Sequence, residues 1–105
     1  MKLFTKEIER KMAQGNRTSV CKIFNPYGNQ TWIIFGEDDV RDPDILFAVV
    51  DLGMGYIEAG SVRRSELESL RVTIGKCDLP LERDRSYRGG QTVAELCALD
   101  SLVGI

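Results

Sequence analysis

An unbroken run of apolar residues, Ile45-Leu46-Phe47-Ala48-Val49-Val50, decides how the rest of this chain must be arranged. The run lacks the polar alternation of a half-exposed strand and is typical of a strand covered on both faces. Such a strand needs neighbouring strands for its hydrogen bonds and other elements to cover its side chains. We therefore expect it to be a central strand of a sheet and the best candidate for the core.

Four further segments have the composition of strands or ordered loops. Residues 18–24 and 31–35 are rich in β-branched and aromatic side chains, and the turn formers of residues 25–30 between them predict a β-hairpin. Gly53 and Gly55 predict a turn that tolerates positive φ, and a fourth strand is expected over residues 56–62. An edge strand or ordered loop is expected over residues 79–84, because a residue before proline is pushed out of the helical region.

Three stretches carry signals for helix starts. Thr5 can cap a helix over residues 6–14 that ends at Gly15. Ser65 with Glu68, and Thr92 with Glu95, have the spacing of a capping box, in which the hydroxyl and the carboxylate satisfy amides at the helix start. The first box predicts a short helix through residue 70. The second predicts a final helix whose apolar face consists of Val93, Leu96, Ala98, Leu99 and Leu102.

These segments predict one α+β domain over residues 1–105, with a mainly antiparallel sheet of about four to five strands packed by N- and C-terminal helices. A chain of 105 residues with 43% hydrophobic side chains is ordinary for one globular domain and excludes a two-domain enzyme. No apolar run approaches the length of about 18 residues that spans a bilayer, and charge follows soon after Met1. We expect no signal peptide, no membrane association and a cytoplasmic location.

The absence of histidine limits the chemistry that the chain can perform. Neither a Ser-His-Asp nor a Cys-His arrangement is possible, and an enzyme would need a carboxylate pair such as Glu58 with Glu82 or Asp84. The three cysteines, Cys21, Cys77 and Cys97, are widely spaced and surrounded by apolar residues, so we expect buried thiols and no zinc site. We predict a protein that is not an enzyme and has no metal or cofactor.

One segment is strongly acidic. Between Glu37 and Asp51 there are six acids and one base, although the net charge of the chain is only -2. A solvated loop, a Ca²⁺ or Mg²⁺ site without EF-hand spacing and a contact surface for a basic partner are all open interpretations. An acidic surface can compete with nucleic acid for a phosphate-binding groove, which is our leading hypothesis. The candidate partner-binding residues are Glu37, Asp38, Asp39, Asp42, Asp44 and, as an exposed aromatic anchor in the predicted hairpin turn, Tyr27.

A second hypothesis is a nucleic-acid-binding face. Residues 63–88 contain seven bases and five acids, and the bases could gather on one surface, although the interleaved acids favour ion pairing. The candidate residues are Arg63, Arg64, Arg83, Arg85 and Arg88. Gly89 and Gly90 precede a predicted helix, but no Lys-Ser/Thr pair follows them, so a turn with a cap is favoured over a phosphate loop. Trp32, within the predicted hairpin, is expected in the core.

Short motifs spread along the chain carry a resemblance to a known family. They are Leu3-Phe4-Thr5-Lys6-Glu7-Ile8-Glu9, Pro26-x-Gly28-x-x-Thr31-Trp32, Asp51-Leu52-Gly53-Met54-Gly55 with Glu58 and Gly60, Ser65-Glu66-Leu67-Glu68, Leu79-Pro80-Leu81-Glu82-Arg83-Asp84 and Thr92-Val93-Ala94-Glu95-Leu96. With these motifs the chain resembles a family of small uncharacterised proteins, a domain of unknown function, from bacterial plasmids, integrative elements and phages. It departs from the family pattern at residues 57–60, where the family tends to have Pro-Glu-Leu-Gly.

The resemblance implies a mobile-element setting, in which small compact proteins often bind host machinery such as restriction and CRISPR complexes. We therefore expect a non-catalytic protein that binds a protein or ribonucleoprotein complex of the bacterial host and inhibits or modulates a defence complex through its acidic surface. The alternative is a nucleic-acid-binding accessory protein that uses the arginine-rich face. We expect a monomer or a homodimer, because an exposed edge strand can pair with a second copy.

Overall fold

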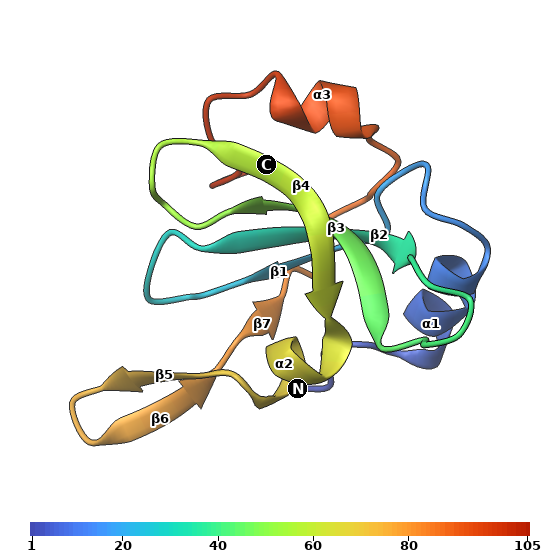
Figure 1. The fold of residues 1–105 in the computed structure, drawn as a ribbon. Coiled ribbons are helices and arrows are strands. Elements are labelled where there is room, and N and C mark those ends of the chain that lie inside the picture. Colours follow the sequence, from blue (N-terminus) through green and yellow to red (C-terminus); the bar gives the residue numbers. More distant parts are fainter.

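The computed structural model describes residues 1–105 and confirms the α+β fold class (Figure 1). Its framework is a five-stranded antiparallel sheet in the order β4-β3-β2-β1-β7. The strands are β1 (Cys21–Phe24), β2 (Thr31–Glu37), β3 (Ile45–Asp51), β4 (Ile57–Arg63) and β7 (Glu82–Arg83). Strands β5 (Arg71–Ile74) and β6 (Cys77–Pro80) form a separate hairpin that projects from the rest of the molecule. The helices are α1 (Lys6–Ala13), α2 (Arg64–Ser69) and α3 (Val93–Cys97).

The apolar run of residues 45–50 forms β3, an interior strand, but the middle position of the sheet belongs to β2. The first six residues of β2 are all buried. Side chains of β3 reach both faces, as predicted, because Leu46 and Ala48 belong to one apolar cluster and Val49 and Phe47 pack with the other. The register between β2 and β3 shifts between Ile34 and Gly36, which marks a bulge in β2.

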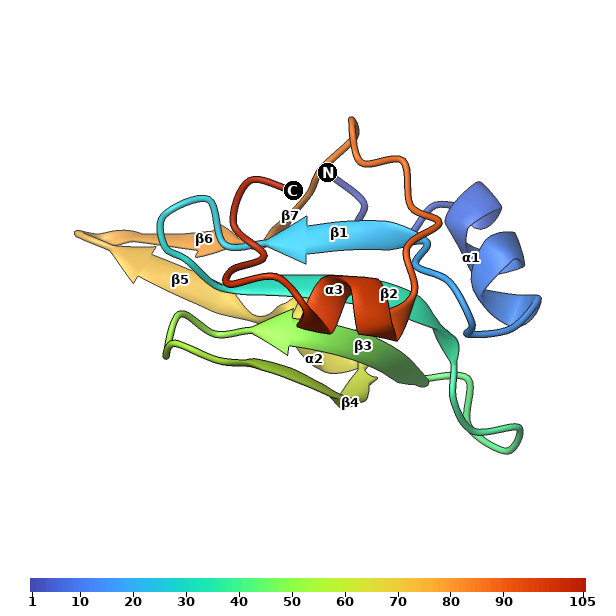
Figure 2. The ribbon, with the colours of Figure 1, turned by 90° about the horizontal axis from the view of Figure 1, so that it is seen from above.

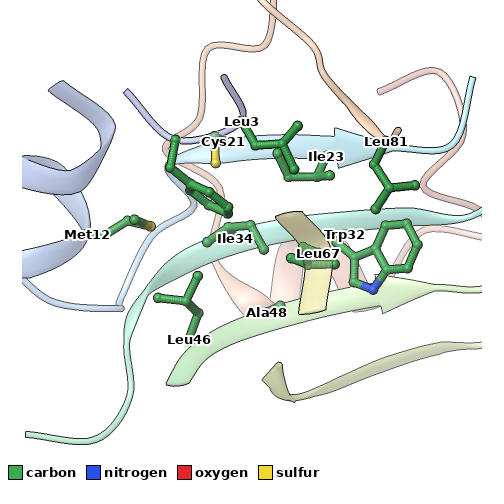
Figure 3. Packing of buried hydrophobic residues seen from close by; sticks show 11 residues of the cluster. Leu3, Met12, Cys21, Ile23, Trp32, Ile34, Leu46, Ala48, Leu67 and Leu81 are labelled. Atoms are coloured by element: carbon green, nitrogen blue, oxygen red, sulfur yellow. The ribbon is translucent and has the colours of Figure 1, made fainter. Parts of the chain in front are cut away.

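The larger apolar cluster covers one face of the sheet and is shown in Figure 3. Phe4 from the N-terminal segment, Met12 from α1 and Leu67 from α2 pack there against strand residues such as Ile34. Trp32 is also buried in this cluster, which confirms its predicted core position. The N-terminal helix and α2 therefore supply the cover that the apolar strands require.

The smaller cluster lies on the opposite face, beneath α3 and the C-terminal segment (Figure 2). The rings of Phe35 and Phe47 meet edge to face there, with 5.5 Å between their centroids. Asp51, at the end of β3, accepts hydrogen bonds from the backbone N–H of Leu102 at 2.9 Å and the hydroxyl of Ser101 at 3.2 Å. These bonds hold the pKa of the Asp51 carboxyl below its usual range and fasten the C-terminal segment to the sheet.

Two of the predicted helix starts are confirmed. The Thr5 hydroxyl accepts a hydrogen bond from the backbone N–H of Ile8 at 3.3 Å, and α1 ends just before Gly15, whose φ is 136°. The Thr92 capping box is complete, because Thr92 accepts from the backbone of Glu95 at 3.2 Å and Glu95 accepts from the backbone of Thr92 at 3.0 Å. No helix of the structure combines the length and the apolar character needed to cross a membrane.

The capping box predicted at Ser65 is wrong. Helix α2 begins at Arg64, directly where β4 ends, so Ser65 lies inside the first turn and cannot cap it. The carboxylate of Asp44 instead accepts from the backbone N–H of Ser65 at 2.8 Å and from its hydroxyl at 2.7 Å. The start of α2 is thus satisfied by a side chain from the loop between β2 and β3.

Other predictions from local sequence also need correction. The hairpin of β5 and β6 was not predicted, and α3 ends at Cys97, which leaves Leu99 exposed. Of the three thiols expected in the core, only Cys21 is buried, whereas Cys77 and Cys97 are exposed. Cys77 lies in the projecting hairpin between Lys76 and Asp78, and Cys97 is the last residue of α3, so neither thiol is covered by the sheet. Burial raises the pKa of the Cys21 thiol to about 12, so this group stays protonated and unreactive.

Candidate functional site

The predicted acidic residues lie on the connection between β2 and β3. Glu37 ends β2 and is half-buried, and residues 38–44 form what we call the acidic loop. The loop is closed at its base by a hydrogen bond from the N–H of Asp38 to the carbonyl of Ile45 at 2.9 Å. The Asp38 carboxylate accepts from the Ser61 hydroxyl at 2.9 Å and from the Asn16 side chain at 3.2 Å, so it connects the loop to β4 and to the segment after α1.

The remaining carboxylates of the acidic loop hold its conformation. Asp39 accepts from the backbone N–H of Arg41 at 2.8 Å, and Asp42 accepts from the N–H of Asp44 at 3.0 Å, both as Asx turns. The guanidinium of Arg63 lies 3.3 Å from Asp42 and 3.6 Å from Asp44. The hydrogen bonds from Ser65 and the charge of Arg63 hold the pKa of Asp44 below its usual range. At the tip of this loop the side chain of Val40 is fully exposed.

Tyr27 does not join the acidic residues. It is exposed, as predicted, but its turn precedes β2 whereas the acidic loop follows β2, so the two lie at opposite ends of the strand (Figure 1). Tyr27 instead shares its end of the sheet with the turn between β3 and β4, where Met54 and Tyr56 are also exposed. The predicted partner surface is therefore two separate surfaces.

The predicted arginine face also divides. Arg63 is bound to the acidic loop, and Arg64 donates from Nη1 to the Glu9 carboxylate at 2.7 Å. The Arg64 Nε lies 3.5 Å from Glu68, and the guanidinium lies 4.8 Å from the centroid of the Phe4 ring. The hydrogen bond and charge of Arg64 hold the pKa of Glu9 below its usual range. Both arginines therefore fasten α2 and the loops around it, and of their acidic partners only Glu68 is one of the interleaved acids of residues 63–88.

The other three arginines do lie together. Arg83, Arg85 and Arg88 belong to β7 and the segment that follows it, and all three line one hollow against α1. Arg83 donates to the backbone carbonyl of Leu3 at 2.7 Å, which fixes its guanidinium. The side chains of Arg85 and Arg88 form no hydrogen bond or ion pair within the chain and are exposed to solvent.

Two adjoining hollows make up what we call the basic groove. One has a volume of about 520 Å³ and lies between the end of α1 and residues 15–20, and the other, of about 290 Å³, lies between α1 and residues 83–88. They share Lys11, Val20 and Arg88. The bases that line them are Lys11, Arg17, Arg83, Arg85 and Arg88, and the acids are Glu7 and Asp84. Lys11 and Arg17 were not predicted, because both lie far in the sequence from the arginine-rich segment of residues 63–88.

A hydrogen-bond network braces the segment that carries Arg85 and Arg88. The N–H of Ser19 donates to the carbonyl of Gln91 at 2.8 Å, and the N–H of Gly90 donates to the carbonyl of Ser19 at 2.8 Å. The Tyr87 hydroxyl lies 2.7 Å from Ser19 Oγ, and burial raises its pKa, so it stays protonated. A Cβ at Gly89, whose φ is 76°, would lie 2.6 Å from the Ser19 carbonyl, which explains the glycine as a close backbone contact.

The arrangement of polar groups offers no constellation for catalysis by the carboxylate pair considered above. Glu58 lies on β4, whereas Glu82 and Asp84 lie on or next to β7, at the other edge of the five-stranded sheet. No group of three or more Cys, Asp or Glu side chains is arranged to hold a metal ion. Asp84 lies 3.7 Å from the largely buried Lys22 amine, with which it forms an ion pair.

The fold and these surfaces define a small α+β protein with a preformed acidic loop and a basic groove. The model of the family described as Protein of unknown function (DUF2958) matches residues 1–104, so the chain belongs to this family. The resemblance to a family of uncharacterised proteins is thereby confirmed over nearly the whole chain. Comparison with curated proteins and with solved structures gives no significant match.

Proposed function

We propose that this protein is a non-catalytic binding protein that holds the phosphate backbone of a nucleic acid in the basic groove. The observation that carries the proposal is that Arg85 and Arg88 have no partner within the chain, although a network through Ser19 braces their segment. Lys11 and Arg17 line the same groove from the other side. Cations that converge without partners repel each other, and a polyanion relieves this repulsion.

The lining of the groove indicates what kind of contact it makes. Nine of the ten residues around its larger part are not hydrophobic, and the aromatic ring of Tyr87 is half-buried, so the groove offers charges and amides rather than a stacking platform. Phosphate contacts position a nucleic acid but do not read its sequence. We therefore expect binding with little dependence on sequence. With four free or weakly paired cations, the slope of log K against log salt should be about −3 to −4.

Fluorescence anisotropy with labelled single-stranded and double-stranded oligonucleotides at several salt concentrations tests the proposal. The double variant Arg85→Gln/Arg88→Gln should weaken binding and make the salt slope shallower by about 2. The control Arg41→Gln/Lys76→Gln removes the same charge from the acidic loop and from the turn between β5 and β6. Equal losses in both double variants, or no binding by the unaltered protein at low salt, would contradict the proposal.

A second candidate function is carried by the acidic loop. Its carboxylates fix the loop before any partner arrives, and Val40 is fully exposed at its tip. A rigid loop loses little conformational entropy on binding, which favours recognition by a protein groove. In this version the protein serves a plasmid, integrative element or phage in the bacterial cytoplasm and inhibits or modulates a restriction or CRISPR complex by occupying its nucleic-acid groove.

Pull-down from a bacterial host lysate, with and without nuclease, distinguishes the two candidates. A discrete host complex that survives nuclease treatment and is lost with Val40→Lys, which alters the exposed tip without removing a hydrogen-bonded carboxylate, would support the acidic-loop version. Asp42 and Asp44 are left unchanged, because they hold Arg63 and α2 and their loss would disturb the fold. Retention that disappears with nuclease and with Arg85→Gln/Arg88→Gln would support the basic groove instead.

A further inference from the structure

The outer strand β4 leaves one edge of the sheet open. It pairs with β3 along all seven of its residues, from Ile57 to Arg63, and no strand pairs with its other side. Residues 58–61 are exposed, and Figure 2 shows β4 at the outer edge of the sheet. The opposite edge strand, β7, has only two residues. The open backbone groups of the sheet are therefore concentrated along β4.

The ladder with β3 shows which backbone groups of β4 point outward. The N–H of Arg64 donates to the carbonyl of Asp44 at 2.8 Å, so this N–H faces β3. Backbone groups alternate along a strand, and the register has no shift between β3 and β4. The even-numbered residues of β4 therefore bond to β3. The N–H and C=O groups that face solvent belong to Ile57, Ala59, Ser61 and Arg63.

Nothing along this edge discourages pairing. Edge strands are commonly protected by proline, lysine, a bulge or a charge in the middle, and β4 has none of these. Its centre is Ala59-Gly60-Ser61. Gly60 has no positive φ, no bulge and no atom within 4 Å of where a Cβ would lie, so no contact within the chain explains a glycine at this position. A glycine in a regular strand often marks the close approach of another backbone.

We propose that β4 pairs with β4 of a second copy, antiparallel and with the two-fold axis at Gly60, which joins two five-stranded sheets into one continuous sheet. In this register Ala59 lies opposite the partner's Ser61, and Ile57 lies opposite the partner's Arg63. All four outward-facing residues of each copy then lie in hydrogen-bonded pairs. Gly60 and the partner's Gly60 form the pair on the axis, where the backbones approach most closely.

Symmetry and charge favour a second copy over an unrelated peptide. The outward-facing residues are placed symmetrically about Gly60, so antiparallel self-pairing leaves none of them without a partner. In this register Glu58 lies opposite the partner's Val62 and Arg63 lies opposite the partner's Ile57, so the pairing places no two like charges opposite each other. The basic groove is next to β1 and β7, at the other edge of the sheet, and stays open in this dimer.

Sedimentation velocity over a range of protein concentrations tests the pairing. Ala59→Pro removes only an outward N–H and leaves the ladder to β3 intact, and we expect it to weaken the dimer at least about tenfold. The matched control Ala59→Val keeps the N–H and should remain dimeric. Circular dichroism and urea unfolding confirm that both variants are folded. A protein that is monomeric at all concentrations, or an Ala59→Pro variant as dimeric as the control, would overturn the proposal.

A second pair of variants tests the position of the axis. Gly60→Lys and Gly60→Glu each place two like charges opposite each other on the axis, and no atom of the same copy lies within 4 Å of the added Cβ. Each variant alone should be monomeric, and an equimolar mixture should form a heterodimer. Dimers that persist in either variant alone, or a mixture that stays monomeric, would show that the axis does not pass through Gly60.

Discussion

The acidic loop and the basic groove lie next to each other, with Gly15 and Asn16 contributing to the surface of both, yet they use their charges in opposite ways. Every carboxylate of the acidic loop accepts a hydrogen bond from within the chain. In the groove, Arg17, Arg85 and Arg88 donate none from their side chains. The density of charge in the sequence thus does not show which charges are available for binding, because partners within the fold neutralise some of them first.

Side-chain length explains part of the difference. An aspartate two residues before an N–H can accept from it directly, so a loop rich in aspartate satisfies its own carboxylates. An arginine reaches further and depends on whichever acid or carbonyl the fold brings near. Arg64 meets Glu9 and the ring of Phe4, whereas Arg88 meets only solvent.

The largest effect is expected at Gly36, because the end of α1 that it contacts borders both the acidic loop and the basic groove. A Cβ at Gly36 would collide with the carbonyl oxygen of Gly15 and lie 2.7 Å from that of Met12, so Gly36→Ala pushes the end of α1 away from β2. We expect a loss of about 3 kcal/mol in the free energy of unfolding, measured by urea denaturation. Gly60→Ala, measured at a protein concentration at which the chain is monomeric, is the control, since its Cβ meets nothing within the chain, and it should be neutral or stabilising by about 0.5 kcal/mol. Equal effects at both glycines would disprove this account of the packing.

A smaller effect on the free energy of unfolding should distinguish Arg64, which has partners within the chain, from Arg88, which has none. Arg64→Ala removes the contacts with Glu9, Glu68 and the Phe4 ring, and we expect it to cost about 1–2 kcal/mol of unfolding free energy. Arg88→Ala removes the same charge and should change stability by less than about 0.5 kcal/mol. If Arg88→Ala proves as destabilising as Arg64→Ala, the division between structural and available charges does not hold.

The pH dependence of stability should reveal Asp44 as a structural acid. Its pKa is lowered in the folded protein, so the ionised carboxylate contributes stability that is fully present above the unfolded pKa of about 3.9. This contribution is lost as the pH falls below that value and through the folded pKa. Asp44→Asn should therefore lower the urea midpoint at pH 7, and the difference from the unaltered protein should shrink in acid. Asp38→Asn, which removes a carboxylate at the other end of the same loop, provides the comparison, and a difference for Asp44→Asn that does not change with pH would refute the role.

The smallest effect on the fold is expected at Lys11. Its amine lies 3.7 Å from Glu7 across one helical turn, in an exposed pair whose loss costs about 0.3–0.5 kcal/mol. Lys11→Gln should nevertheless make the salt slope of nucleic-acid binding shallower by about 1, because the amine lines both parts of the basic groove. Urea unfolding and fluorescence anisotropy on the same samples measure the two effects. An unchanged salt slope would show that Lys11 does not contribute to nucleic-acid binding in the groove.

Much of the fold follows from local sequence, whereas the site does so only in part. The hairpin of β1 and β2 was predicted because the turn formers between Asn25 and Gln30 act within a few residues. The alternative face of five arginines was predicted only as a whole, and the structure keeps Arg83, Arg85 and Arg88 together while separating Arg63 and Arg64 from them. The groove itself was not predicted, since it requires Ser19 to meet Gln91, 72 residues further along the chain.

By itself the sequence determined the turns at residues 25–30 and 53–55, the apolar strands and the helix starts at Thr5 and Thr92, because these depend on residues a few positions apart. Only the tertiary structure decided that Asp44 rather than Ser65 satisfies the start of α2. It also decided that Arg64 is bound and Arg88 is free. The physical reason is competition for partners, since a polar group bonds to whichever acceptor the fold places within hydrogen-bonding distance, however far apart the two are in the chain.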